Sequence, residues 1–261
     1  MTETTNSAVL PEGLTLPGPS ITGATGGSGT RVVARIVRTA GLYTGEKLNP
    51  YEDAVELGFY SDRWIDRYVE AGGDVSAGTH AEMEADLRGV LADHLSIVTD
   101  GAVAWGWKEP RSIYLLRFWS ETMPDVRFLH FLRDGRDMAF SENQNQLTKH
   151  GAAVLGDDLR KAKTHTRSIA LWNRVNLAAA DFGERELGPR YLRVRFEDLC
   201  AEPAATIGAI LDFFGLEGDA EAAAAEVRPP DSLGRWQLRR RKVIDEITET
   251  AHPGLERFGY L

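Results

Sequence analysis

Apolar residues recur at helical spacing directly after a glycine-rich turn near the beginning of the chain. One face of the predicted helix carries Val32, Val33, Ile36, Val37 and Ala40, and Gly41 is well placed to end it. A short strand candidate leads into the turn. The pattern therefore predicts strand, glycine turn and helix, the unit that opens nucleotide-binding α/β folds.

Three later apolar stretches predict further strands, and helical stretches separate them. The strand candidates are 103–107, 126–132 and 191–196. Residues 42–53 are expected to form a loop, and helices are expected near 53–70, 79–96, 112–122 and 158–187 and through Ile207, Ile210, Leu211 and Phe214. Such alternation predicts an α/β fold of three αβα layers, with a central, mainly parallel sheet and ligands at the carboxyl ends of its strands.

Length and charge narrow the choice of protein class. The 261 residues suit one domain over 19–261, after a flexible leader over 1–18 that is rich in Thr, Ser, Pro and Gly. A formal net charge of −9 argues against a non-specific nucleic-acid binder. The single Cys200 excludes an internal disulfide and a cysteine-based metal site. No transmembrane segment or signal peptide is evident, which favours the cytoplasm.

The glycine turn itself predicts an anion site. Gly23, Gly26, Gly27 and Gly29 fall within seven residues, just before a helix N-terminus whose amides and dipole favour phosphate or sulfate. Ser28 and Thr30 add hydroxyl groups. No lysine follows the last glycine, so the ATPase pattern fails.

A TGxxxGxG pattern in the same turn matches short-chain reductases that bind NAD(P). Their Tyr-x-x-x-Lys pair has one counterpart here, Tyr43 and Lys47, which stands just after the first helix and so in the wrong part of the sheet. No acidic residue closes a second strand to hold a ribose. This reductase remains the alternative enzyme, and a non-catalytic anion-binding module is a third possibility.

Two more basic sites follow predicted strands. Lys108 and Arg111 flank Glu109-Pro110, where the proline ends the strand. Arg133 follows the most apolar strand, and Ser141 is expected two turns into the helix that begins at residue 134 or 135. Arg133 suits bidentate contact with a phosphate, and Ser141 could face the same group.

In this order the motifs resemble the sulfotransferases that use 3′-phosphoadenosine 5′-phosphosulfate (PAPS) and release adenosine 3′,5′-bisphosphate (PAP). The resemblance runs from about Ile21 to the Gly259-Tyr260 ending and is nearest to bacterial branches of the family. It implies a phosphosulfate loop like a P-loop and a 3′-phosphate site at Arg133 and Ser141. It also implies a late basic segment at Arg235 and Trp236, and an adenine contact at Phe196 or Trp236.

One position departs from the family. The loop usually carries Lys or Arg before Ser-Gly-Thr, and here that position is Gly27. Lys108 and Arg31 are the candidates to replace the missing cation, and Lys108 is favoured. The loop residues that the resemblance assigns to the nucleotide are Gly26, Gly27, Ser28, Gly29, Thr30 and Arg31.

The resemblance also implies the reaction. Lys108 stabilises an in-line sulfuryl transfer, and a carboxylate takes the acceptor's proton. The base candidates are Glu46, in a Gly-Glu pair as in carbohydrate and tyrosyl-protein sulfotransferases, and Asp53. His130 is expected in the core. The acceptor is expected to be a small hydroxyl compound, a sugar or natural product, and no metal, nucleic acid or membrane is expected to take part. A homodimer is possible.

Overall fold

Five parallel strands form the centre of the protein in the computed structural model, which describes residues 9–157 and 159–261. The strand order across the sheet is β2-β3-β1-β4-β5. The strands are β1 (Ser20–Gly23), β2 (Leu42–Tyr43), β3 (Ala104–Lys108), β4 (Arg127–Leu132) and β5 (Tyr191–Arg195). Every pairing is parallel, so the carboxyl ends meet at one edge of the sheet.

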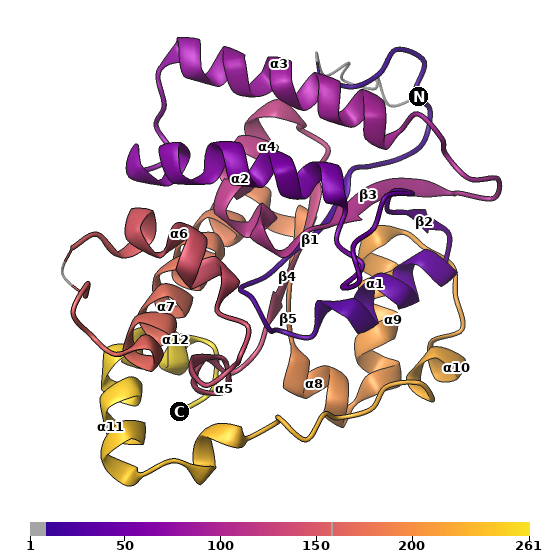
Figure 1. Cartoon of the computed structure of the whole chain (residues 1–261). Helices are drawn as coiled ribbons and strands as arrows, with labels where there is room; N and C mark the ends of the chain where they lie inside the picture. The colour runs from indigo at the N-terminus through magenta and orange to yellow at the C-terminus, as the bar shows by residue number, and fades with distance from the viewer. Residues whose placement is uncertain (1–8, 158) are drawn as a thin grey trace.

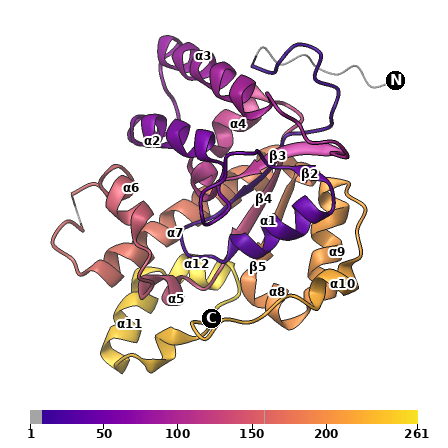
Figure 2. The same ribbon diagram turned by 45° about the vertical axis from the view of Figure 1, so that its right-hand side comes forward.

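Helices cover both faces of this sheet (Figures 1 and 2). One face packs against α1 (Thr30–Thr39), α8 (Phe196–Ala201), α9 (Pro203–Phe214) and α10 (Ala220–Ala224). The other packs against α2 (Val55–Glu70), α3 (Ala77–His94), the 3-10 turn η1 (Pro110–Leu115), α4 (Leu116–Thr122), α6 (Asn145–Leu155) and α7 (Thr164–Phe182). Against α7 lie α5 (Gly135–Ala139), α11 (Arg241–Thr250) and α12 (His252–Arg257). The predicted three-layer α/β fold is confirmed.

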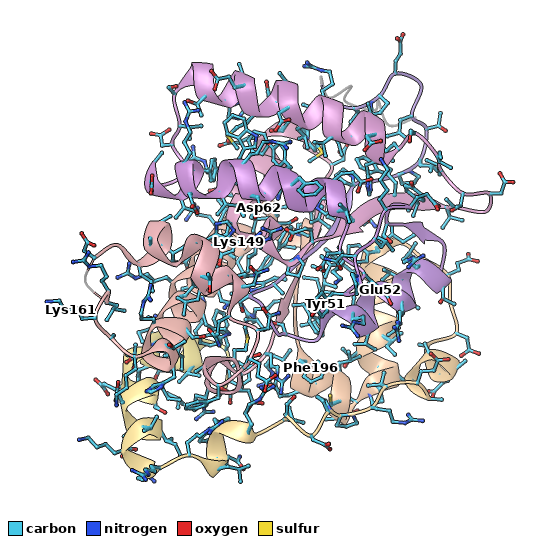
Figure 3. The ribbon with its side chains drawn as sticks, viewed as in Figure 1. Tyr51, Glu52, Asp62, Lys149, Lys161 and Phe196 are labelled. Atoms are coloured by element: carbon cyan, nitrogen blue, oxygen red, sulfur yellow. The ribbon has the colours of Figure 1, made fainter. Side chains whose placement is uncertain are left out.

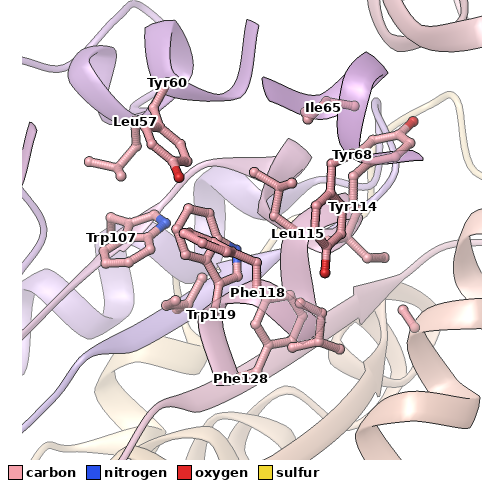
Figure 4. Packing of buried hydrophobic residues seen from close by; sticks show 14 of the residues in the cluster. Leu57, Tyr60, Ile65, Tyr68, Trp107, Tyr114, Leu115, Phe118, Trp119 and Phe128 are labelled. Carbon is pink, nitrogen blue, oxygen red and sulfur yellow. The ribbon is translucent and has the colours of Figure 1, made fainter. Parts of the chain in front are cut away.

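Strand β4 shows why the sequence folds in this way. Successive side chains of a strand point to opposite faces, and Phe128 joins one hydrophobic cluster while Leu129 and Phe131 join the other. The larger cluster is rich in aromatic rings, and Trp107 and Trp119 meet edge to face in it (Figure 4). Continuous apolar runs of this kind are expected of strands buried on both faces.

Several boundaries differ from the sequence predictions. Residues 42–43, expected in a loop, form the edge strand β2. Helix α6 lies before the helical region predicted over 158–187 and was not predicted, and that region forms α7 only from Thr164 onward, with residue 158 outside the described residues. Helix α5 ends at Ala139, so Ser141 lies beyond it and not two turns inside a helix. Short segments of this kind take their structure from tertiary packing, which outweighs local propensity.

Part of the predicted leader packs against the domain. Val9 is fully buried, and Leu10, Leu14 and Leu16 lie against the larger cluster. The hydrophobic core therefore extends to the amino-terminal side of residue 19. Residues 1–8 of the predicted leader lie outside the described residues. No helix within residues 9–157 and 159–261 combines the length and the apolar character that a membrane crossing requires.

Candidate functional site

The carboxyl ends of four strands supply the candidate site. The glycine turn follows β1, Lys108 is the last residue of β3, Arg133 follows β4, and Phe196 follows β5. Gly26 to Gly29 of the turn line one cavity of about 1450 Å³ together with Lys108, Arg133 and Phe196. Ligand pockets usually hold about 300–1,000 Å³, so this cavity has room for two small molecules side by side.

The glycine turn at residues 24–29 presents free backbone donors to the cavity. The amides of Gly27, Ser28 and Gly29 donate to no acceptor in the described part of the chain. Gly27 and Gly29 have φ values of 84° and 85°, which favour glycine. A Cβ on Gly29 would stand 2.7 Å from the Phe196 ring. The turn therefore lies directly on Phe196, and the N-terminus of α1 points at the same space.

The hydroxyl groups of the turn have different surroundings. Ser28 is buried, and its hydroxyl donates to the Thr25 carbonyl at 2.6 Å and lies 3.5 Å from the Met138 sulfur. Ser28 therefore holds the turn together. Thr30, at the first position of α1, lines the cavity.

Arg133 is buried at the base of the cavity. Its guanidinium donates to Asp137 at 3.0 Å and to the Ser232 carbonyl at 2.7 Å, and it reaches the Gly27 carbonyl at 3.5 Å. It also lies 5.1 Å from the centre of the Phe196 ring. Its Nε has no hydrogen-bond partner among residues 9–157 and 159–261. A buried cation with an unused donor is suited to an anionic ligand.

Ser141 and Arg133 meet at Gly27. The Ser141 hydroxyl lies 3.3 Å from the position of a Cβ on Gly27, so Arg133 and Ser141 both lie near Gly27, although Ser141 is not among the residues that line the cavity. The charged residues of this segment form buried ion pairs, Arg133 with Asp137 and Arg136 with Asp134.

The late basic segment reaches the cavity through Arg235 only. Arg235 lines the cavity, and burial together with the Arg133 charge lowers the pKa of its guanidinium. Trp236 is not among the lining residues, and its ring instead lies 3.9 Å from the Arg136 guanidinium. Of the two rings expected to contact adenine, Phe196 lies at the cavity and Trp236 does not.

Lys108 is held by the loop that precedes α2. The side chain is 3% exposed, and its ammonium donates to the Tyr51 carbonyl at 2.6 Å and forms an ion pair with Asp53. An ammonium has three donor hydrogens, so one remains. The structure thus places Asp53 beside Lys108 in the cavity.

Glu46 lies elsewhere. It is exposed and lines a separate hollow of about 520 Å³ between α1 and the loop before β3. The structure therefore brings Asp53, and not Glu46, to Lys108. Arg31 is an exposed residue of α1 at the cavity wall, 5.2 Å from the centre of the Tyr51 ring. Arg31 thus lines the cavity from α1, whereas Lys108 lies at the carboxyl end of β3.

An ionic network lines the far wall of the cavity. Arg111 donates to Glu109 at 2.8 Å, to the Gly58 carbonyl at 3.0 Å and to Asp62. Burial raises the pKa of Glu109, and the Arg111 charge opposes that rise. Asp62 also accepts from Lys149 at 2.8 Å (Figure 3). The cations and carboxylates of this wall are thus paired with each other.

His130 is a core residue, as predicted. It is fully buried and bonded to Asn176 and Tyr191 at 2.8 and 2.5 Å, and burial lowers its pKa to about 4.

The residues of the reductase alternative are separated from the site. The Tyr43 hydroxyl donates to the His94 carbonyl, and burial raises its pKa to about 12. Lys47 is paired with Asp93 on the surface. Neither residue lines the cavity of the glycine turn, so the structure does not favour a reductase.

Four site residues were missed from the sequence. Tyr51 offers a carbonyl, Ser232 offers a carbonyl and a hydroxyl, Asn49 holds Asp53, and Phe59 is 61% exposed at the cavity wall. None belongs to a motif. Of the four, only Phe59 gave a signal in the sequence, because it is an aromatic residue within the helix predicted over 53–70.

Comparison with known proteins shows the family of the chain. A family model described as "Sulfotransferase family" matches residues 30–220, more than half of the chain. No curated protein matches the sequence significantly.

Solved structures show the same fold. Sulfotransferase STF9 from Mycobacterium avium has a TM-score of 0.56 at 12% identity, over 94% of this chain and 77% of that one. A sulfotransferase from Alicyclobacillus acidocaldarius gives 0.50 at 13%, over 93% and 97%. Sulfotransferase STF1 from Mycobacterium tuberculosis gives 0.50 at 15%, over 90% and 76%. At these identities the likeness concerns the fold.

Proposed function

Because the chain belongs to the sulfotransferase family, we propose that it transfers a sulfuryl group from PAPS to a hydroxyl of a small acceptor and releases PAP. The observation that carries this proposal is the convergence of free loop amides, buried Arg133 and Lys108 on one cavity. We further propose that the enzyme acts in the cytoplasm without nucleic acid, membrane or metal, either alone or as a homodimer.

The donor half of the cavity suits a nucleotide with two anionic ends. The amides of Gly27 to Gly29 and the α1 N-terminus bind the 5′ end. Arg133, Ser141 and Arg235 hold the 3′-phosphate, to which the unpartnered Nε of Arg133 adds a donor. The Phe196 ring contacts the nucleotide beneath Gly29. The donor supplies a sulfuryl group on a stable phosphate leaving group, so catalysis rests on positioning and electrostatics.

Lys108 and Asp53 are the proposed catalytic pair. As the acceptor oxygen bonds to sulfur, Asp53 takes the hydroxyl proton, and the bond between sulfur and the bridging phosphate oxygen breaks with its electron pair left on phosphate. Lys108 stabilises that developing charge with its remaining hydrogen. A carboxylate has about four lone-pair sites. Lys108 and Asn49 each occupy one lone-pair site of the Asp53 carboxylate, so further sites remain that can accept the proton.

The acceptor half differs in character from the donor half. Val55, Phe59 and Asp62 share a face of α2, and both exposed aromatic rings of the described chain, Tyr51 and Phe59, line the cavity there. The charges of this wall are paired, since Arg111 meets Glu109 and Asp62. We therefore propose an uncharged ring compound as acceptor, whose flat face lies on Phe59.

Mass spectrometry tests the activity. The protein is incubated with PAPS and matched glycosides (a glucoside, a glucuronide and a glucosaminide), and products are searched for the gain of one SO3 unit. We expect the neutral glucoside to be modified by wild type and not by Lys108→Ala, which still binds PAP. Absence of any sulfated product with wild type, with PAP also failing to bind, contradicts the proposal.

A further inference from the structure

Residues Asn49 to Asp53 form a compact loop, here called the Asn49 loop, built on one amide side chain. The Asn49 carbonyl oxygen Oδ1 accepts from the amides of Tyr51 and Asp53 at 2.8 and 3.1 Å. The Asn49 amide nitrogen donates to Asp53 Oδ2 at 2.9 Å, which leaves Oδ1 of Asp53 for Lys108. The loop thus fixes the two oxygens that hold the Lys108 ammonium.

Glu52 lies between Tyr51 and Asp53, the two residues that contact Lys108, and its backbone conformation is unusual. Its φ is 63°, and no other non-glycine residue in the described part of the chain has a positive φ. The Glu52 amide donates to the Asn49 carbonyl at 2.8 Å, but a glutamate side chain lacks the short local hydrogen bond with which Asn or Asp favours this conformation, so the position is strained. A strained residue persists when surrounding interactions hold it there.

The interactions that hold Glu52 come from α1. Glu52 pairs with Arg35 at 2.6 Å and lies 3.9 Å from Arg38, and its side chain is 17% exposed. Arg31 lies over the Tyr51 ring. Positions 31, 35 and 38 share one face of a helix, so one stripe of α1 contacts Tyr51 and Glu52 of the Asn49 loop. Figure 3 shows Tyr51 and Glu52 side by side near this helix.

The stripe of Arg31, Arg35 and Arg38 lies on α1, the helix that directly follows the glycine turn. The turn binds one end of the donor in the proposed function, and the Asn49 loop orients Lys108. We propose that Glu52 is a positioning residue, which sets the Lys108 ammonium and the Asp53 carboxylate relative to the glycine turn through its ion pair with α1. This inference rests on the proposed function. The Arg35 side chain of this pair is 65% exposed, and ion pairs with a solvent-exposed partner usually contribute little to stability, so the positioning role predicts an effect on turnover rather than on folding.

The first experiment separates positioning from folding with Glu52→Gly. Glycine adopts the positive φ without strain while the ion pair is lost. We expect a melting temperature equal to or above that of wild type, an unchanged Kd for PAP, and a kcat lowered by about tenfold or more. Glu52→Gln, which keeps the strain, is expected to lose kcat as well. The matched control is Glu121→Gln, which breaks an exposed pair with Arg117 at 2.7 Å far from the cavity, and it should match wild type.

A second readout needs no turnover. The chain has six lysines, so the side-chain ammonium signal of Lys108 in a lysine-labelled NMR spectrum can be assigned with Lys108→Arg. A hydrogen-bonded, buried ammonium exchanges slowly. We expect its signal in wild type, Glu121→Gln and the conservative Arg35→Lys, and a shifted or lost signal in Glu52→Gly and Arg35→Ala.

The outcomes distinguish the two proposals. If Glu52→Gly keeps both the Lys108 signal and wild-type kcat, Glu52 is an ordinary surface pair and the positioning role is wrong. If Glu52→Gly loses stability and PAP binding together, its role is structural and the inference is equally overturned. If wild type binds no PAP and transfers no sulfuryl group, the proposed function fails, whereas the Lys108 signal still decides whether Glu52 positions that side chain.

Discussion

Asp137 accepts a hydrogen bond from Arg133 at 3.0 Å, and both side chains are buried at the carboxyl edge of the sheet. The same carboxylate accepts from the amides of Gly234 and Trp236 at 2.8 and 3.3 Å. One buried charge thus joins the end of β4 to a segment about 100 residues later. Asp137 and the Ser232 carbonyl, which both accept from the Arg133 guanidinium, hold this side chain at the cavity.

Removal of this carboxylate should destabilise the protein strongly. Asp137→Ala leaves the Arg133 guanidinium buried with its charge uncompensated, and such losses cost about 3–5 kcal/mol. Chemical denaturation measures the free energy of unfolding. The control is Asp245→Ala, whose exposed pair with Arg241 at 2.8 Å should contribute about 0.5 kcal/mol or less. Equal effects of the two substitutions would show that the Asp137 pair is not structural.

Arg133→Lys should weaken nucleotide binding in a way that depends on the 3′-phosphate. Lysine keeps the charge but loses the planar fork of donors, so we expect about tenfold weaker binding of PAP, by analogy with lost charge-assisted hydrogen bonds. Adenosine 5′-phosphate has no 3′-phosphate, and its affinity should change little. Calorimetry of both ligands checks this. An equal loss of affinity for both nucleotides would mean that Arg133 contacts another part of the ligand than the 3′-phosphate.

Gly29→Ala should disrupt the glycine turn. The residue has a φ of 85°, and its new Cβ would meet the Phe196 ring at 2.7 Å. Strain of this kind costs of order 1–3 kcal/mol, and PAP affinity should fall with it. Gly89→Ala is the control, since Gly89 lies in α3 with open space around it and alanine favours a helix. Thermal unfolding compares the two. A Gly29→Ala protein as stable as Gly89→Ala contradicts this packing.

The fold was predictable because its signals are local and repeated. Glycine turn, apolar strands and the basic residues after them place Lys108 and Arg133 at strand ends before any contact is known. Other features depend on residues far apart in the chain. Asp53 meets Lys108, and Trp236 meets Arg136, only once the sheet and its connections are assembled. For that reason Glu46 and Asp53 were equivalent candidates in sequence and differ in the structure.

Acid should destabilise the protein through His130. Burial lowers the pKa of His130 from 6.5 to about 4 in the folded chain, so between these values the unfolded chain binds more protons. The contribution of His130 to the free energy of unfolding is therefore complete above pH 6.5. About 3 kcal/mol of that contribution is lost as the pH falls toward 4. Burial also lowers the pKa of His94 and His150, which adds to the slope.

Denaturation at a series of pH values measures that slope. In His130→Gln, which cannot take up the proton, the free energy of unfolding should fall less steeply between pH 6.5 and 4 than in wild type. Parallel curves for the two proteins would mean that His130 does not resist protonation in the fold.

Binding of PAP tests the central claim most directly. Titration calorimetry of wild type with PAP, adenosine 5′-phosphate and NADPH asks whether the cavity recognises a nucleotide with anionic groups at both ends. We expect one molecule of PAP to bind each chain, about tenfold or more tightly than adenosine 5′-phosphate, and NADPH to bind no better than adenosine 5′-phosphate. Heat of binding from NADPH with none from PAP would contradict the account.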